Sequence, residues 1–130
     1  MIVDTSAIVA ILKGEPGHLA LMKTIVADPD PKISAATLVE VHAVADQRGQ
    51  PAQSRRVNNL LRVLRIRVVP FDEDQARVAS EAYAIFGEGS GHPSKLNLGD
   101  CFSYALAACL LEPLLFVGDD FSHTDIQLAE

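Results

Sequence analysis

The sequence predicts an α/β fold with a central parallel sheet flanked by helices. Short apolar runs typical of strands alternate with longer helical patterns along the chain, and this order indicates parallel strands joined by helices. Hydrophobic residues make up 48% of the chain and aromatic residues only 5%, which fits a sheet buried on both faces better than a solvent-exposed one. The length of 130 residues suits one core, so we assign residues 1–130 to a single domain.

The order of the elements follows from hydrophobic periodicity and from the residues that interrupt it. Asp4 and Asp72 are typical N-caps, and Gln75 stands where a capping box has its second member. Prolines and glycines end helices, and residues 87–94 form a glycine-rich loop. In chain order we predict strand 1–3, helix 5–13, helix 18–27, strand 32–35, helix 37–48, helix 52–64, strand 67–70, helix 72–86, helix 99–111 and strand 114–117.

The formal net charge of −6 argues against a uniformly basic surface for nucleic acids. One short stretch is nevertheless rich in arginine and is either a solvated helix face or a local phosphate contact: Arg55, Arg56, Arg62, Arg65 and Arg67. Cys101 and Cys109 lie about 12 Å apart on one predicted helix, too far for a disulfide, so we expect both to be buried. The apolar run 8–12 is too short to cross a bilayer, and no basic leader precedes it. We therefore expect a cytoplasmic protein without membrane contact.

Acidic residues follow the first and last predicted strands and begin two of the predicted helices. Asp4 comes directly after the first strand, and Asp119 and Asp120 follow the last one. Glu40 and Asp100 lie near the starts of helices that can pack over the same edge of the sheet. Because parallel α/β sheets bind ligands at the carboxyl ends of their strands, we expect these acids to converge on one pocket.

Each acid also has an ordinary structural explanation. Asp4 is suited to cap a helix, and Glu40 stands three residues after Thr37, the spacing of a capping box. Asp100 lies in the first turn of a helix, where a negative charge suits the helix dipole, and the pair after the last strand consists of common turn residues. Taken singly, each acid is explained by local structure as well as by function.

The apolar surroundings of two of these acids favour a cation site. Asp100 begins an almost wholly apolar helix, and Glu40 stands among Leu38, Val39 and Val41. Buried carboxylates are costly unless they are paired or bound to a cation, and several unpaired acids resist joint ionisation. An all-oxygen donor set favours Mg²⁺ or Mn²⁺ over zinc. Such a site leaves positions for water and phosphate oxygens, as in metal-assisted phosphodiester hydrolysis.

Four blocks of the sequence carry a resemblance to a known family. They are residues 2–7, 38–41, 96–107 and 114–126, with Asn97-Leu98-Gly99-Asp100 in the third block and Gly118-Asp119-Asp120-Phe121 in the fourth. In this order and across the whole chain, the blocks resemble a PIN-domain toxin of the VapC type. The last two blocks are specific to that family, whereas the first is a weak motif when taken alone.

The resemblance implies an α/β/α sandwich and a Mg²⁺- or Mn²⁺-dependent endoribonuclease that cuts transfer or ribosomal RNA. It also implies a homodimer and inhibition by a small cognate antitoxin protein. The matching core acids are Asp4, Glu40 and Asp100. For the fourth catalytic and metal-binding acid we choose Asp120, with Asp119 as a substitute or water-mediated ligand. Many family members have an acid at the position of Gly118, so this departure leaves the number of metal ions open.

Weaker candidates for substrate contact stand beside one of the acids or in the loop before the last helix: Ser6, Asn97, Ser103 and Lys95. Ser6 places a hydroxyl beside the metal position, and Asn97 can orient Asp100. Ser103 lies on the same helix face as Asp100. Neither His92 nor His123 belongs to a clear acid–base pair, so we assign no catalytic role to them.

Two other functions remain open from the sequence. A phosphatase would use Asp4 as its nucleophile, but such enzymes commonly carry a second Asp two residues later, where this chain has Ser6. A catalytically inactive protein-binding module of the same fold is disfavoured because all four acid positions are filled. Cleavage of RNA with Mg²⁺, compared with a metal-free control, separates the module from the enzyme.

Overall fold

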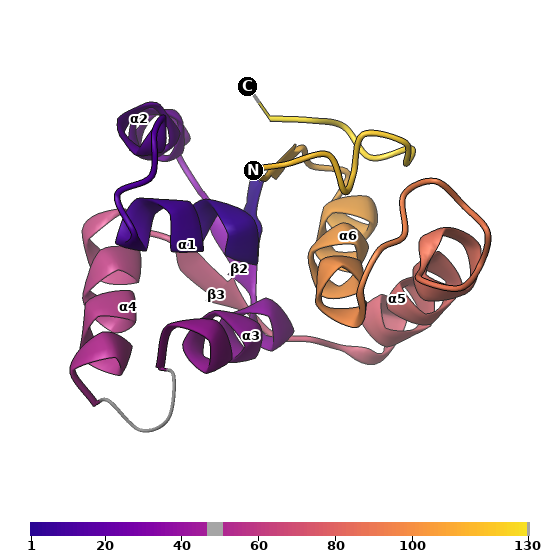
Figure 1. The fold of residues 1–130 in the computed structure, drawn as a ribbon. Helices are drawn as coiled ribbons and strands as arrows, with labels where there is room; N and C mark the ends of the chain where they lie inside the picture. The colour runs from indigo at the N-terminus through magenta and orange to yellow at the C-terminus, as the bar shows by residue number, and fades with distance from the viewer. Residues whose placement is uncertain (47–50, 130) are drawn as a thin grey trace.

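The computed structural model describes residues 1–46 and 51–129, and at its centre lies a four-stranded sheet (Figure 1). The strand order is β3-β2-β1-β4, and neighbouring strands are parallel throughout. The strands are β1 Ile2–Val3, β2 Lys32–Ser34, β3 Arg67–Val69 and β4 Leu114–Leu115. Because β1 and β4 are neighbours, the acid after the first strand and the acids after the last strand leave the sheet at the same edge.

Helices join the strands at the positions expected from the sequence, with ends that differ by no more than two residues. They are α1 Thr5–Leu12, α2 His18–Ala27, α3 Ala35–Asp46, α4 Pro51–Val63, α5 Glu73–Phe86 and α6 Leu98–Leu110. The predicted end of the helix 37–48 falls on residues outside the described part of the chain. Among the described residues, no helix combines the length and the apolar character needed to cross a bilayer.

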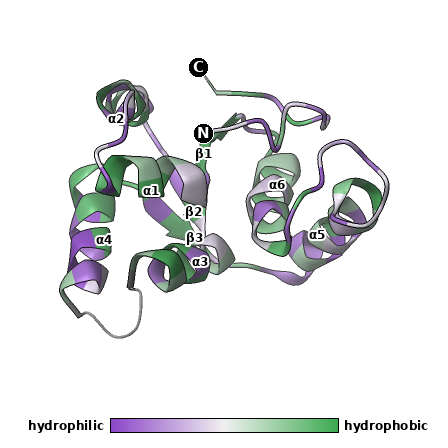
Figure 2. Cartoon of the chain, in the orientation of Figure 1, coloured by the Kyte–Doolittle hydropathy of each residue, from purple (hydrophilic) through white to green (hydrophobic). Residues whose placement is uncertain are grey.

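Alternate residues of the strands enter two separate hydrophobic cores, so both faces of the sheet are buried. Val3 and Leu115 pack into the core formed with α1, α3 and α4, whereas Ile2 and Leu114 pack into the core formed with α5 and α6. Figure 1 shows these two groups of helices on opposite sides of the sheet. Helix α4 carries both hydrophobic and hydrophilic residues (Figure 2), and its Val57 is fully buried. The predicted α/β/α sandwich is confirmed.

Charged groups pair with one another at the amino ends of the strands. The ammonium of Lys32 lies 2.9 Å from Glu112 Oε1 and 3.2 Å from Asp30 Oδ2. Arg67 donates two hydrogen bonds to the carboxylate of Asp30, at 3.0 and 3.1 Å, and the amino group of Met1 also contacts Glu112. At this edge of the sheet the acids therefore face cations, in contrast to the acids at the carboxyl edge.

Two local predictions away from the acids are wrong. Gln75 does not complete a capping box, because its side-chain amide donates to the carbonyl of Pro70 at 3.0 Å while only Asp72 acts as a cap. Cys101 is buried as expected, but Cys109 is exposed. It lies in the last turn of α6, whose residues reach solvent beyond the core.

Candidate active site

Asp4 follows β1 directly and caps helix α1. Its Oδ2 accepts hydrogen bonds from the backbone N–H of Ser6 at 3.1 Å and from the Ser6 hydroxyl at 2.8 Å. Its Oδ1 accepts a hydrogen bond of 2.6 Å from the hydroxyl of Ser103 in α6. Asp4 is only 3% exposed, and burial raises its pKa although these hydrogen bonds act in the opposite direction. The capping explanation is thus correct but covers only one of the two carboxylate oxygens.

Asp100 occupies the first turn of α6 and forms a reciprocal capping box with Asn97. The backbone N–H of Asn97 donates to Asp100 Oδ2 at 2.9 Å, and the backbone N–H of Asp100 donates to the Asn97 side chain at 2.8 Å. Burial raises the pKa of Asp100 to about 7, and the charges of Asp4, Asp120 and Glu40 add to the effect. Asn97 therefore orients this acid, as the sequence suggested.

Glu40 reaches the same region from α3. The hydroxyl of Thr5 donates a hydrogen bond to its Oε1. The carboxylate also lies against Gly99 so closely that a β-carbon at this glycine would overlap it. The predicted capping box with Thr37 is wrong, because α3 begins earlier, at Ala35, and the Thr37 side chain is fully buried next to Ser103. Glu40 is free of a capping role and faces the start of α6.

The segment after β4 carries Asp119 and Asp120, which are both exposed. The backbone N–H of Val117 donates to the Ser6 hydroxyl at 2.9 Å and ties this segment to the start of α1. Gly118 has a φ of +102°, a conformation that strains residues with a side chain. Of the two acids, Asp120 is the one whose charge raises the pKa of Asp100, so Asp120 is the better candidate for the fourth position.

These acids share one site without a compensating cation. Within the described part of the chain, no ion pair joins a Lys or Arg to any of them. Burial raises the pKa of Asp100 most, and repulsion by the charges of the other three acids raises it further. A cation, or another positively charged group, that lies among such acids reduces their repulsion. The repulsion therefore favours binding of a positive charge at this cluster. The members are Asp4, Glu40, Asp100 and Asp120.

The donor chemistry of the cluster fits a hard divalent cation, since every potential ligand is a carboxylate oxygen. No group of three or more potential ligands among the described residues already stands at metal-binding spacing. Mg²⁺ commonly keeps several waters and binds through one or two carboxylates together with substrate phosphates, so it needs no closed protein cage. The fit rests on the donor type and on the unbalanced negative charge.

Ser103 was expected to contact substrate, but its side chain has no exposed surface. Its hydroxyl instead donates to Asp4 and lies 3.2 Å from the hydroxyl of Thr37. Ser103 is therefore a positioning residue for Asp4. Lys95 is exposed, and it lines a cavity next to the loop between α5 and α6.

Two of the five arginines lie away from the acids. Arg56 donates to the carbonyl of Leu12, at the end of α1 remote from Asp4. Arg67 pairs with Asp30 at the amino end of β3, across the sheet from the carboxyl edge. These two arginines are therefore structural contacts and do not contribute to a phosphate site at the acids.

Three residues of the site were missed by sequence reasoning: Thr5, Thr37 and Gly99. Thr5 could have been noticed because it is adjacent to Asp4, and Gly99 because glycine is unfavourable inside a helix. Thr37 had no local signal, since its contact with Ser103 joins α3 to α6. Their partners become apparent only when the helices are packed.

We expect Ser103→Ala to weaken Mn²⁺ binding and RNA cleavage by about tenfold, because Asp4 Oδ1 loses a charge-assisted hydrogen bond. The unfolding free energy should fall by about 1–2 kcal/mol. Titration calorimetry with Mn²⁺, an RNA cleavage assay and chemical denaturation measure the three effects. Ser80→Ala is a matched control, since Ser80 is exposed and donates only to a backbone carbonyl of its own helix. Equal Mn²⁺ affinity in both variants would contradict the positioning role.

The raised pKa of Asp100 predicts a pH-dependent stability in metal-free protein. Between its ordinary value of 3.8 and about 7, the folded state binds more protons than the unfolded state, so the unfolding free energy decreases as pH rises through this window. With allowance for solvent screening, the loss is about 1–3 kcal/mol. Asp100→Asn, whose amide oxygen can still accept from Asn97, should lose the part of this dependence that Asp100 contributes, while Asp4, whose pKa burial also raises, keeps its own part. Denaturation at several pH values, with Mg²⁺ added as a second series, provides the measurement, and identical slopes in both proteins would refute the prediction.

The comparisons with known proteins agree with this architecture. A family model described as PIN domain matches residues 1–127. The chain is 54% identical over 129 residues to ribonuclease VapC42 of Mycobacterium tuberculosis, covering 99% of this chain and 98% of that protein. It is 47% identical over 129 residues to ribonuclease VapC28 of the same species, covering 99% and 97%.

Two solved structures share the fold. The VapC20 toxin of M. tuberculosis, described as cleaving the sarcin–ricin loop, superposes with a TM-score of 0.72 at 20% identity and covers 96% of this chain and 95% of that one. VapBC2 of Rickettsia felis, bound to a DNA fragment from its promoter, gives 0.75 at 14% identity, covering 98% and 95%. The chain belongs to the PIN-domain family and, within it, to the VapC-type ribonuclease toxins.

Proposed function

We propose that the protein is a metal-dependent endoribonuclease that hydrolyses phosphodiester bonds of transfer or ribosomal RNA. The observation that carries this proposal is the convergence of four acids at one sheet edge, without an ion-pair partner in the described residues and with the pKa of Asp100 raised to about 7. The ribonuclease relatives support RNA as the substrate. The cofactor would be Mg²⁺ or Mn²⁺.

The chain positions the donors that such an ion requires. Bound at the acids, the ion would polarise the phosphate and lower the pKa of a coordinated water. Ser103 and Ser6 hold the two oxygens of Asp4, Asn97 holds Asp100, and Thr5 holds Glu40. Asp120, the fourth acid, is exposed on the segment after β4, so the site is open to solvent on that side. A substrate phosphate can enter from that side.

The proposal includes an antitoxin partner, a homodimer and a cytoplasmic location. A solved neighbour described as a toxin–antitoxin complex from Klebsiella pneumoniae supports the antitoxin, with a TM-score of 0.72. An unneutralised carboxylate cluster is chemically suited to accept an arginine from an inhibitor, because guanidinium and carboxylate form paired hydrogen bonds. The dimer and the location stay predictions.

The phosphatase function receives no support from the geometry. Such enzymes commonly carry a second Asp two residues after the nucleophilic one. Here Ser6 stands at that position, and its hydroxyl donates to Asp4 Oδ2 at 2.8 Å. The inactive-module function predicts no cleavage under any metal condition, so the test below separates it from the enzyme.

The test is metal removal followed by restoration. Purified protein treated with EDTA should leave cellular RNA intact, and added Mg²⁺ or Mn²⁺ should restore cleavage at discrete positions, whereas Zn²⁺ should not. Sequencing the RNA ends identifies the cut sites and the RNA class. Cleavage that persists in EDTA would contradict metal dependence, and intact RNA under all conditions would favour the binding module.

A further inference from the structure

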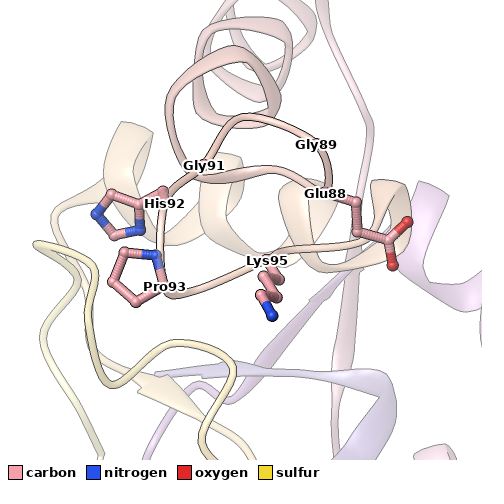
Figure 3. Close-up of a pocket in the computed structure, with 6 residues that line it drawn as sticks. All are labelled: Glu88, Gly89, Gly91, His92, Pro93 and Lys95. Carbon is pink, nitrogen blue, oxygen red and sulfur yellow. The ribbon is translucent and has the colours of Figure 1, made fainter.

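A cavity of about 480 Å³ lies within the loop that joins α5 to α6 (Figure 3). Figure 3 shows the rings of His92 and Pro93 close together and the Lys95 side chain beyond them. The cavity combines a cation, an aromatic ring and a glycine-rich backbone. Its lining residues are Glu88, Gly89, Gly91, His92, Pro93 and Lys95.

The loop is closed at its base and holds its aromatic ring in place. The backbone N–H of Glu88 donates to the Leu96 carbonyl at 2.9 Å, and the N–H of Leu96 donates to the Phe86 carbonyl at 2.8 Å. The rings of His92 and Phe86 lie nearly perpendicular with their centroids 4.8 Å apart, and His92 Nδ1 accepts from the backbone N–H of Ser94 at 3.1 Å. The ring is thus ordered before any ligand arrives, which lowers the entropic cost of binding.

Apart from Glu88, whose carboxylate points away from His92 and Pro93 (Figure 3), the polar groups of the cavity suit an anion. Lys95 is exposed and has no ion-pair partner in the described part of the chain. The backbone N–H groups of Gly89 and Gly91 donate no hydrogen bond within the described residues, and both glycines have a positive φ. Exposed N–H groups in such turns, together with a nearby ammonium, form concave sites for phosphate oxygens.

We infer that this cavity binds one nucleotide of the RNA substrate beside the cleaved bond. Lys95 and the glycine N–H groups would contact its phosphate, and the face of His92 would stack on its base. Lys95 stands two residues before Asn97, which holds Asp100, so one short segment connects this cavity to the acids. The inference rests on the proposed function for the identity of the ligand as RNA.

RNA binding by variants of the full chain provides the first test. Each variant carries Asp4→Asn to prevent cleavage, and the probe is a fluorescently labelled single-stranded RNA of mixed sequence. Lys95→Gln should raise the Kd by about three- to tenfold and reduce the slope of log Kd against log salt by about one. His92→Ala should raise the Kd by about fivefold or more through lost stacking. Lys23→Gln, at an exposed position of α2, is the matched control and should change neither quantity.

Chemical-shift mapping with small probes provides the second test. Inorganic phosphate should shift the backbone amides of residues 89–95, and a 5′-mononucleotide should also shift the ring resonances of His92. If the mononucleotide shifted only the backbone amides and left the ring of His92 unchanged, base stacking on His92 would be overturned. If neither probe caused a shift, or if Lys95→Gln and the control had equal Kd values, the whole inference would be overturned. Failure of the proposed function would look different, because metal-dependent cleavage would be absent while phosphate still shifted the loop.

Discussion

Asp4→Asn is expected to abolish RNA cleavage, by a thousandfold or more, and to leave the protein folded. The substitution removes the negative charge of the acid that both α1 and α6 hold in place. An asparagine can keep the contacts, since its oxygen can accept from Ser6 and its amide can donate to the Ser103 hydroxyl once that hydroxyl turns. The unfolding free energy should change by less than about 1 kcal/mol, because the cost of burying the charge disappears together with part of the hydrogen-bond strength.

Asp72→Asn is the matched control for this variant. Asp72 is also an N-cap, it accepts from the backbone N–H of Gln75 at 2.9 Å, and it is exposed. Asn caps helices as well as Asp does, so cleavage and stability should both be unchanged. A time course of RNA cleavage in Mg²⁺, with circular dichroism to check folding, compares the two. Wild-type cleavage by Asp4→Asn would remove Asp4 from the active site, and so would an equal loss in Asp72→Asn.

Gly99→Ala is expected to reduce cleavage by about a hundredfold through displacement of Glu40. A β-carbon at this position would overlap the Glu40 carboxylate, and a shift of about 1 Å at a catalytic group costs a factor of this size. Helix propensity alone predicts a gain in stability, because Ala is favoured over Gly by about 1 kcal/mol. The Glu40 carboxylate is the flexible end of its side chain and can move aside when it gives up the hydrogen bond from Thr5, so the unfolding free energy should change by no more than about 1 kcal/mol.

A double-mutant cycle with Glu40→Ala isolates this contact. In the background without the carboxylate, Gly99→Ala should become stabilising, since the colliding atoms are gone and the helix propensity of Ala remains. Chemical denaturation of the four proteins yields the interaction energy, and RNA cleavage by the single variant measures the catalytic effect. An equal effect of Gly99→Ala on the unfolding free energy in both backgrounds would show that Glu40 is not the colliding group.

The secondary structure was predictable because its determinants are local. Hydrophobic periodicity and the prolines and glycines between the elements set their order, and Asp4 and Asp72 cap their helices as expected. The rule that parallel sheets present their sites at the carboxyl ends of strands was enough to group the acids. The structure brings Asp4, Glu40 and Asp120 close enough to raise the pKa of Asp100.

The resemblance to the family added what local pattern could not. Periodicity and strand order predict an α/β/α sandwich, but many functions share that architecture. The blocks around Asp100 and Phe121 predicted one family among those that share this architecture, the PIN domain. The family model and the VapC relatives show that the chain belongs to it. Gly118 departs from the expected acid, and its positive φ shows that the chain makes a left-handed turn there.

The fold class, the element order and the set of acids could be predicted from the sequence alone, because spacing and composition determine them. Only the tertiary structure decided how each acid is held. Glu40 is bound by Thr5 and has no capping partner in Thr37, and Ser103 contacts Asp4 where a substrate contact was expected. These contacts join helices that are distant in the chain, and their geometry depends on how α1, α3 and α6 pack around the end of β1. Short-range patterns carry no information about that packing.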